Sequence, residues 1–407
     1  MARLTARKLE QAGDLVKTAG VDVWLTFVRE TAEGSDPVLP FLIEGGLTWQ
    51  SALLIDRTGR RVAIVGNYDA DPLRASGDWD EVIPYVKGIR ELLLETLERL
   101  IPASAERPRI AINWSLDDPK ADGITHGMKL QLDEILSGTR FAGCCISGEA
   151  IVGGVRSRKI PDEIERVRRA ISSTMEILHE IPQIARVGQT ERQVYDQIQQ
   201  LVIDRGLGFS WDRQGDPIVN SGPDSMIGHG IPSETIRIAP GHIFHIDLGV
   251  VCDGYASDLQ RSWFVGEADA RGHADTHDPP EEVTRAFRAV HGAISEAAAV
   301  LHPGVEGWCV DDVARRFITS AGYPEYQHAL GHQVGRMAHD GGALLGPRWE
   351  RYGKTPCLPV EPNQVYTLEL GVLVDGRGYL GIEEMVLITD TGCAWLSERQ
   401  SAMPILR

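Results

Sequence analysis

Two acidic residues lie in an apolar segment whose spacing predicts a β-hairpin. The segment GHIFHIDLGVVCDGYASDLQRSWFV (241–265) contains an Asp-Gly dipeptide, which favours a tight two-residue turn. Such a turn sets Asp247 opposite Gln260 and leaves Asp258 diagonal to Asp247 on the same face. Two neighbouring carboxylates repel each other unless a cation lies between them. Taken alone, the pair also fits two ordinary aspartates on a solvated face, although the apolar runs around it favour burial.

A second hairpin with two acidic residues is predicted near the carboxyl end, in VYTLELGVLVDGRGYLGIEEMVLIT (365–389). Glu369 and Glu383 are equidistant from Gly376 in the turn, so a loop of odd length sets them directly opposite each other. Buried like charges at this spacing require a shared proton or a metal ion. Glu384 should point to the other face, because side chains alternate along a strand.

A histidine between glycines is the fifth candidate. His332 lies between Gly331 and Gly335 in HALGHQVGRMAHDGG (328–342), where the backbone can approach a ligand closely, and His339 follows seven residues later. A lone histidine in this setting is more often structural than a ligand. Four candidate carboxylates elsewhere in the chain change that balance.

Four oxygen-donor side chains and one imidazole form a hard, anionic set that suits divalent ions better than a thiolate-rich zinc site would. Two such ions, about 3.5–4 Å apart, can activate a water molecule and polarise a carbonyl group. The residue types therefore indicate metal-assisted hydrolysis.

The remaining sequence must position these residues. Short β-type and helix-type runs alternate in the first third, and no cluster of catalytic residue types occurs there, so we expect a supporting α/β domain over 1–150. The helix signal that begins with KIPDEIERVRRA opens a second domain, 151–407, with further helices over 190–206, 281–301 and 310–322.

Composition excludes several classes of protein. The chain has 407 residues and a formal net charge of −17, which would repel a phosphate backbone, so nucleic acid is not an expected partner. It has no apolar run of the roughly 18 residues that a membrane helix needs, and the amino terminus lacks the apolar core of a signal peptide. With only six cysteines and no CxxC pair, we expect a cytoplasmic protein with reduced thiols and no membrane contact.

Five segments in order resemble the pita-bread metallohydrolases, the family of aminopeptidase P, prolidase (Xaa-Pro dipeptidase), methionine aminopeptidase and the metal-free creatinase. The segments are KIPDEIERVRRA, MIGHGIPSETIRIAPGHIFHIDLGVVCDGYASDLQRSW, GHQVGRMAHD, YTLELG and GIEEMVLITDTG. The resemblance implies an α+β fold, with a pita-bread catalytic domain preceded by a smaller creatinase-like α/β domain. That amino-terminal domain is typical of the prolidase, aminopeptidase P and creatinase branch.

The resemblance also implies roles for individual residues. His229 matches a histidine that contacts the substrate, His339 one that assists the leaving group, and Glu369 the carboxylate that accepts the nucleophile's proton. It implies two divalent ions per chain, manganese or cobalt first and zinc or iron as alternatives, and a homodimer. The implied metal ligands are Asp247, Asp258, His332, Glu369 and Glu383.

The chain departs from the family pattern at two positions. The family commonly has Arg where this chain has Gly381, and Thr where it has Gln260. The segment GGALLGPRWERYG (341–353) is also unusual, and it is either a cover that supplies the missing cation or an ordinary surface loop. Its candidate side chains are Arg348, Trp349, Arg351 and Tyr352.

The expected function is hydrolysis of the bond before proline at the amino end of peptides or in Xaa-Pro dipeptides. A creatinase-like or other small-molecule C–N hydrolase or lyase is the alternative on the same fold. An inactive binding homologue is the third hypothesis, and the presence of all five ligand types argues against it.

Overall fold

The computed structural model describes residues 3–33, 36–228, 230–266 and 278–407. The chain divides into two compact units, Met1–Ile160 and Pro161–Arg407. This division lies later than the boundary at 150 expected from the sequence, because helix α6 (Glu149–Ser157) buries Ile151, Val152 and Val155 in the core of the first unit. No helix in the described part of the chain is long and apolar enough to cross a membrane.

Unit 1 is built on a six-stranded sheet of order β4-β3-β2-β1-β5-β6. The apolar runs predicted as strands form β1, β2, β3 and β5, and the turn after Asp56 joins β2 to β3 as an antiparallel hairpin. The elements are α1 (Leu4–Ala19), β1 (Val23–Val28), α2 (Leu39–Leu42), β2 (Ser51–Asp56), β3 (Arg61–Gly66), α3 (Ala70–Ser76), β4 (Glu81–Tyr85), α4 (Arg90–Leu100), β5 (Ile110–Ile112), α5 (His126–Leu136), β6 (Cys145–Ser147) and α6.

Unit 2 contains three sheets, of orders β11-β10-β7, β16-β12-β9-β8 and β13-β14-β15. Its elements are α7 (Pro161–Ile184), α8 (Glu191–Asp204), β7 (Gly208–Phe209), β8 (Ile218–Ser221), β9 (Ile243–Leu248), β10 (Val250–Cys252), β11 (Tyr255–Ala256), β12 (Leu259–Val265), α9 (Glu281–Val300), α10 (Gly307–Ser320), β13 (Val365–Val374), β14 (Gly378–Ile388), β15 (Cys393–Trp395) and β16 (Ile405–Leu406).

Two helices of unit 2, α7 and α8, begin at residues that favour a helix start. At the start of α8, the Thr190 hydroxyl accepts a hydrogen bond from the Gln193 N–H, and the Gln193 side chain accepts one from the Thr190 N–H. This reciprocal arrangement satisfies two of the backbone donors that every helix leaves unpaired at its amino end. Pro161 occupies the first position of α7, where its missing N–H costs nothing.

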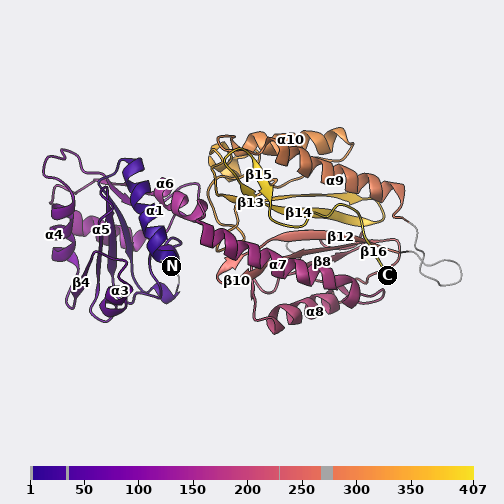
Figure 1. The fold of residues 1–407 in the computed structure, drawn as a ribbon, viewed down its shortest axis with the longest axis horizontal. Helices are drawn as coiled ribbons and strands as arrows, with labels where there is room; N and C mark the ends of the chain where they lie inside the picture. Colours follow the sequence, from indigo (N-terminus) through magenta and orange to yellow (C-terminus); the bar gives the residue numbers. More distant parts are fainter. Residues whose placement is uncertain (1–2, 34–35, 229, 267–277) are drawn as a thin grey trace. The chain divides into compact units, whose positions relative to one another are not determined.

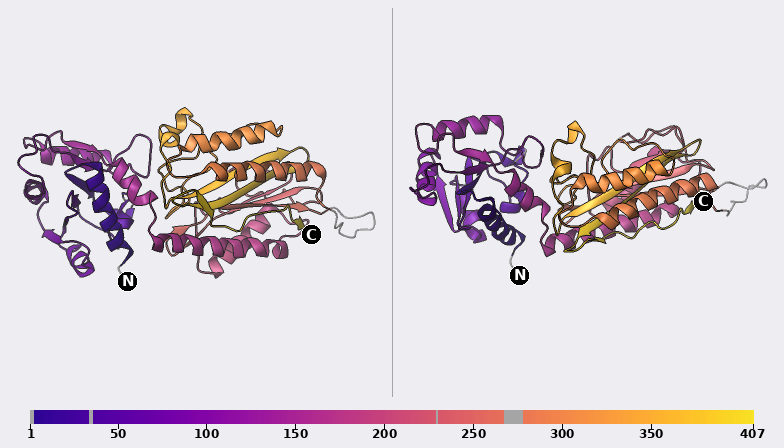
Figure 2. Two further views of the ribbon diagram at one scale, coloured as in Figure 1. Left: turned by 45° about the horizontal axis from the view of Figure 1, so that its top comes forward. Right: turned by 90° about the horizontal axis from the view of Figure 1, so that it is seen from above.

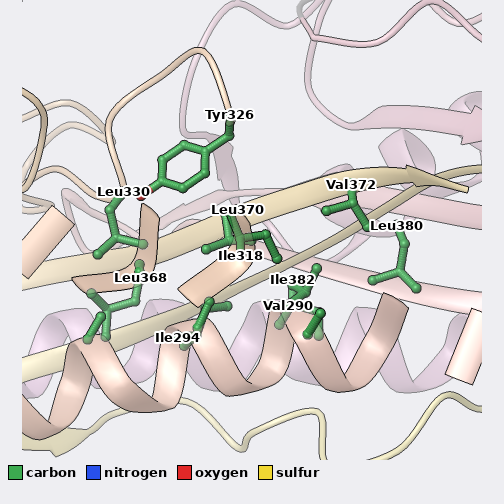
Figure 3. Close-up of a cluster of buried hydrophobic side chains, with 14 of the residues drawn as sticks. Val290, Ile294, Ile318, Tyr326, Leu330, Leu368, Leu370, Val372, Leu380 and Ile382 are labelled. Carbon is green, nitrogen blue, oxygen red and sulfur yellow. The ribbon is translucent and has the colours of Figure 1, made fainter. Parts of the chain in front are cut away.

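Two layers of helices enclose the sheets of unit 2. Helices α9 and α10 lie against the β13–β14 hairpin, and α7 and α8 lie on the side of β8 and β12 (Figures 1 and 2). Leu368 and Leu370 of β13 point towards Val290 and Ile294 of α9, in a cluster of buried hydrophobic side chains (Figure 3). Because side chains alternate along a strand, Glu369 between these two leucines points to the opposite face, away from α9.

Candidate metal centre

The first pair of candidate carboxylates is positioned by the hairpin of β9 to β12. Its turn is Asp253-Gly254, where both residues have positive φ, 50° and 76°, as the predicted two-residue turn requires. The predicted register is confirmed, because Asp247 lies opposite Gln260. Asp258 lies between β11 and β12, directly before Leu259, and is buried.

The second pair comes from the hairpin of β13 and β14. Glu369 and Glu383 are direct cross-strand partners, as the spacing around Gly376 predicts. Glu383 is 1% exposed, whereas Glu369 is half-buried. Both side chains lie on the face of the hairpin opposite the leucine cluster.

His332 is held beside β13 by backbone hydrogen bonds. Thr367 N–H donates to the His332 carbonyl at 3.0 Å, and Glu369 N–H donates to the Leu330 carbonyl at 2.7 Å. Gly331 is needed for this approach, since a Cβ there would lie 2.0 Å from the Thr367 carbonyl oxygen. Gly331 thus permits close contact between the His332 segment and β13.

The orientation of the His332 ring is also fixed. Nδ1 lies 3.1 Å from the Ala338 carbonyl oxygen, which can only accept, so Nδ1 carries the proton. Nε2 is left facing Asp258 Oδ2 at 3.7 Å and Glu369 Oε1 at 3.5 Å. A ligand histidine characteristically donates its second N–H in this way.

Asp258, His332 and Glu383 each offer a ligand atom, and these three atoms lie within 4.8 Å of one another. Glu369 contacts His332, and the charges of Asp247 and Glu369 both act on Asp258. The five predicted metal ligands therefore form one cluster of interacting side chains.

These carboxylates repel one another in a buried setting. Burial first, and the charges of neighbouring carboxylates second, raise the pKa of Asp247, Asp258 and Glu383 well above the ordinary value. Burial is the largest single influence on Glu369 and acts in the same direction, but the hydrogen bond and charge of His332, together with the charges of His328 and His339, outweigh it and lower the pKa of that carboxyl.

Several of the buried oxygens have no donor. Asp247 Oδ1 and both carboxylate oxygens of Glu383 accept no hydrogen bond from the described residues. The Gln260 amide is close enough to Glu383 to favour its charged form, but no hydrogen bond of ordinary geometry joins them. Buried acceptors are nearly always satisfied, and divalent cations are the partners that carboxylate oxygens and an imidazole most readily take. The side chains present therefore fit a divalent metal ion.

A comparison with family models identifies the family of this chain. Residues 165–390, more than half of the chain, match the model of metallopeptidase family M24. The chain belongs to metallopeptidase family M24. It is accordingly an enzyme of the metallopeptidase class.

The relatives and solved structures similar to this M24 chain extend over nearly its whole length. An uncharacterized peptidase of Staphylococcus saprophyticus is 27% identical over 391 residues, 95% of this chain and 97% of its own. The X-Pro aminopeptidase of Thermotoga maritima has a TM-score of 0.69 at 24% identity, covering 98% of this chain and 99% of its own. The Xaa-Pro dipeptidase of Bacillus anthracis has a TM-score of 0.73 at 21% identity, covering 99% and 100%. These structures share the two-unit fold, in which an α/β unit precedes the M24 unit.

Of the two predicted catalytic histidines, His339 lies among the described residues. In this M24 chain His339 is exposed to solvent, and its ring lies edge-on to that of His332 with 4.2 Å between ring centroids. It is thus next to the candidate centre. His229 lies outside the described residues.

Glu384 is excluded from the site, as strand alternation predicts. Its carboxylate pairs with Arg261 at 3.0 Å and accepts further hydrogen bonds from the Ser397 hydroxyl and the Gln400 N–H, at 2.6 and 2.8 Å. Glu384 is therefore a structural residue.

The sequence reasoning missed one set of polar contacts. Gln260 Nε2 donates to Glu369 Oε2 at 2.9 Å, and Gln260 Oε1 lies 3.1 Å from His245 Nε2. His245 precedes Asp247 by two residues on β9, so strand alternation placed it on the same face, and this was the signal that could have found it.

The unusual segment 341–353 does not supply atoms at Gly381. Arg348 stacks on Trp308 with 4.1 Å to the ring centroid, and Arg351 stacks on Trp349 at 4.7 Å. The nearest atoms to a Cβ at Gly381 belong to Gln260, Tyr379 and His245. The space next to Gly381 is therefore filled by the strands of the centre themselves.

Proposed function

We propose that this M24 metallopeptidase hydrolyses the peptide bond before proline, at the amino end of peptides or in Xaa-Pro dipeptides. The observation that carries the proposal is the convergence of four acidic side chains and His332 where buried carboxylate oxygens lack donors. The likeness in fold to an X-Pro aminopeptidase and an Xaa-Pro dipeptidase, over nearly the full chain, supports the choice of substrate.

We propose that two divalent ions, manganese or cobalt before zinc or iron, are held there. The proposed ligands are Asp247, Asp258, His332, Glu369 and Glu383. When bound, such ions activate water and polarise the scissile carbonyl.

The chain's own residues would supply the proton transfers and contacts. The Glu369 carboxylate accepts the proton of the attacking water. The His339 imidazole, exposed beside His332, assists departure of the proline nitrogen, since an imidazole titrates near neutral pH. His229 contacts the substrate near the scissile bond. A homodimer and a cytoplasmic location remain predictions from the sequence.

The substrate class is tested by assaying protein loaded with manganese or cobalt against Xaa-Pro dipeptides, longer peptides with proline at the second position, and creatine. We expect cleavage of one or both proline-containing sets, loss of activity with a chelator, and recovery on adding back the ion. Full activity after exhaustive chelation, or turnover of creatine alone by protein that carries no metal, would overturn the proposal in favour of a creatinase-like enzyme.

The role of His339 is tested by His339→Ala. We expect turnover to fall by about 100-fold or more, the scale of lost acid–base assistance, while metal content by elemental analysis stays near the wild-type value. A loss of metal in this variant would place His339 among the ligands instead.

A further inference from the structure

Strands β9, β12 and β14 lie in close contact around Gly381. Gly381 N–H lies 3.2 Å from the Ser262 hydroxyl oxygen, and the same hydroxyl donates to the Gly381 carbonyl at 2.8 Å. A Cβ at Gly381 would lie 2.7 Å from Gln260 Oε1 and 2.8 Å from His245 Nε2. Any larger residue must therefore displace Gln260, His245 or the strand itself.

The side chains that fill this space form a continuous polar chain to the candidate centre. The Asn220 amide donates to the Met226 carbonyl at 2.9 Å, and Asn220 Oδ1 lies 3.2 Å from His245 Nδ1. His245 Nε2 then contacts Gln260 Oε1, and Gln260 Nε2 donates to Glu369 Oε2. His245 is 2% exposed and Gln260 is 7% exposed, so water does not compete freely for these bonds.

The contacts of Gln260 distinguish the two oxygens of Glu369. Oε2 accepts the Gln260 N–H at 2.9 Å, whereas Oε1 faces His332 Nε2 at 3.5 Å. The Gln260 amide cannot turn over without placing its oxygen against the carboxylate. Its orientation therefore fixes which carboxylate oxygen faces the centre.

We propose that Gln260, held by His245 in the space left by Gly381, is a positioning residue that presents Glu369 Oε1 to the metal ion. The proposal rests on the proposed function, because it assigns the orientation of a ligand and proton acceptor of that same site. His245 acts only through Gln260. Partners of a ligand's own hydrogen bonds commonly change metal affinity or activity by about 10–100-fold when removed.

The central test is Gln260→Met, which keeps the length of the side chain but removes its hydrogen bonds. We expect the manganese dissociation constant, measured by calorimetric titration of the metal-free protein, to rise about 10-fold or more. The melting temperature of the metal-free protein should stay near the wild-type value. In the Xaa-Pro assay kcat should fall with little change in KM, since Glu369 acts on the reacting groups.

The matched control is Gln200→Met, the same chemical change at an exposed residue of α8 whose amide donates to Asp204 of the same helix. Its manganese dissociation constant should equal that of the wild type. A tighter comparison comes from His245→Phe, which retains a ring against Tyr379. It should weaken manganese binding in the wild-type background and add no further loss in the Gln260→Met background.

The manganese titration separates this inference from the proposed function. If wild type binds manganese but cleaves no Xaa-Pro substrate, the proposed substrate is wrong and the titration of Gln260→Met still decides the inference. If Gln260→Met binds manganese as tightly as wild type, or if the two substitutions weaken binding additively, the inference is overturned while the peptidase proposal stands. A wild type that binds no divalent ion overturns both.

Discussion

Glu383 and Glu384 are neighbours on β14 and equally buried, at 1% and 0% exposure, yet their surroundings differ completely. Glu384 has Arg261, a hydroxyl and a backbone N–H as partners, whereas neither carboxylate oxygen of Glu383 accepts a hydrogen bond from the described residues. Burial alone therefore does not mark a functional carboxylate. The informative property is burial without a donor.

A second structural ion pair extends the comparison. Arg315 makes two hydrogen bonds to Asp311, at 2.7 and 3.0 Å, and donates to the Tyr326 and His328 carbonyls. Asp311 also accepts from the Leu330 N–H, two residues before His332. The ion-paired residues of unit 2 thus hold in place the segment that carries the candidate ligand His332.

The largest effect is expected from removing the satisfied residue. Glu384→Ala leaves the Arg261 guanidinium buried with no carboxylate partner, and such losses cost about 3–5 kcal/mol. We expect a fall of that size in the free energy of unfolding, measured with denaturant, both with and without metal. A fall that vanishes when manganese is present would mean that Glu384 belongs to the centre after all.

Metal addition should produce the next largest effect. An ion that binds only the folded state stabilises it by about 2.7 kcal/mol at a hundred times the dissociation constant. We expect manganese or cobalt to raise the melting temperature clearly and a chelator to reverse the change. Elemental analysis should find about two ions per chain. An unchanged melting temperature with every divalent ion tried would contradict the metal centre.

Removing the charge of the unsatisfied residue should have a smaller effect of opposite sign. The raised pKa of Glu383 means that its ionisation opposes folding, so its contribution to the stability of the metal-free protein is greatest below the ordinary carboxyl pKa and is lost as pH rises through the raised pKa. Glu383→Gln should therefore stabilise the metal-free protein at neutral pH, because the substitution removes the cost of a buried charge. The gain should disappear in acid, and the response to manganese should be lost. Denaturant unfolding at pH 4 and pH 7.5 measures this difference.

An exposed ion pair sets the lower limit of the comparison. Arg192 and Asp196 lie one turn apart on α8, 2.8 Å from each other, with both side chains largely in solvent. Arg192→Ala should change the free energy of unfolding by about 0.5 kcal/mol or less, and less still in high salt. A change as large as that of Glu384→Ala would undermine the use of burial and donors to rank these charges.

The sequence predicted the features that depend on local spacing. The turn residues set the register of both hairpins. The pairing of Asp247 with Gln260 and of Glu369 with Glu383 could therefore be predicted from the number of residues on each side of the turn. Strand alternation likewise removed Glu384 from the site. The helices α7 to α10 of unit 2 were likewise predicted from sequence patterns.

Other features depend on contacts between segments that are far apart in the sequence, and residue spacing cannot predict such contacts. The contact of Gln260 with His245 and Glu369 joins three strands, and the crowding at Gly381 exists only because β14 lies against β12. From the sequence, Gly381 was simply a missing arginine. Similarly, Gly331 signalled a close approach, but only the structure identifies β13 as the neighbour.

The absence of room at Gly381 also constrains the paths by which this sequence can change. A step from glycine to arginine, the residue that resembling proteins commonly carry, meets Gln260 and His245 at 2.7 and 2.8 Å before the longer side chain is accommodated at all. Such a substitution must displace Gln260, Tyr379 and His245, and displacement of Gln260 gives up its hydrogen bond to Glu369. The two departures from the family pattern, Gly381 and Gln260, are thus coupled by direct contact. The effect of a substitution at Gly381 should therefore depend on which residue occupies position 260.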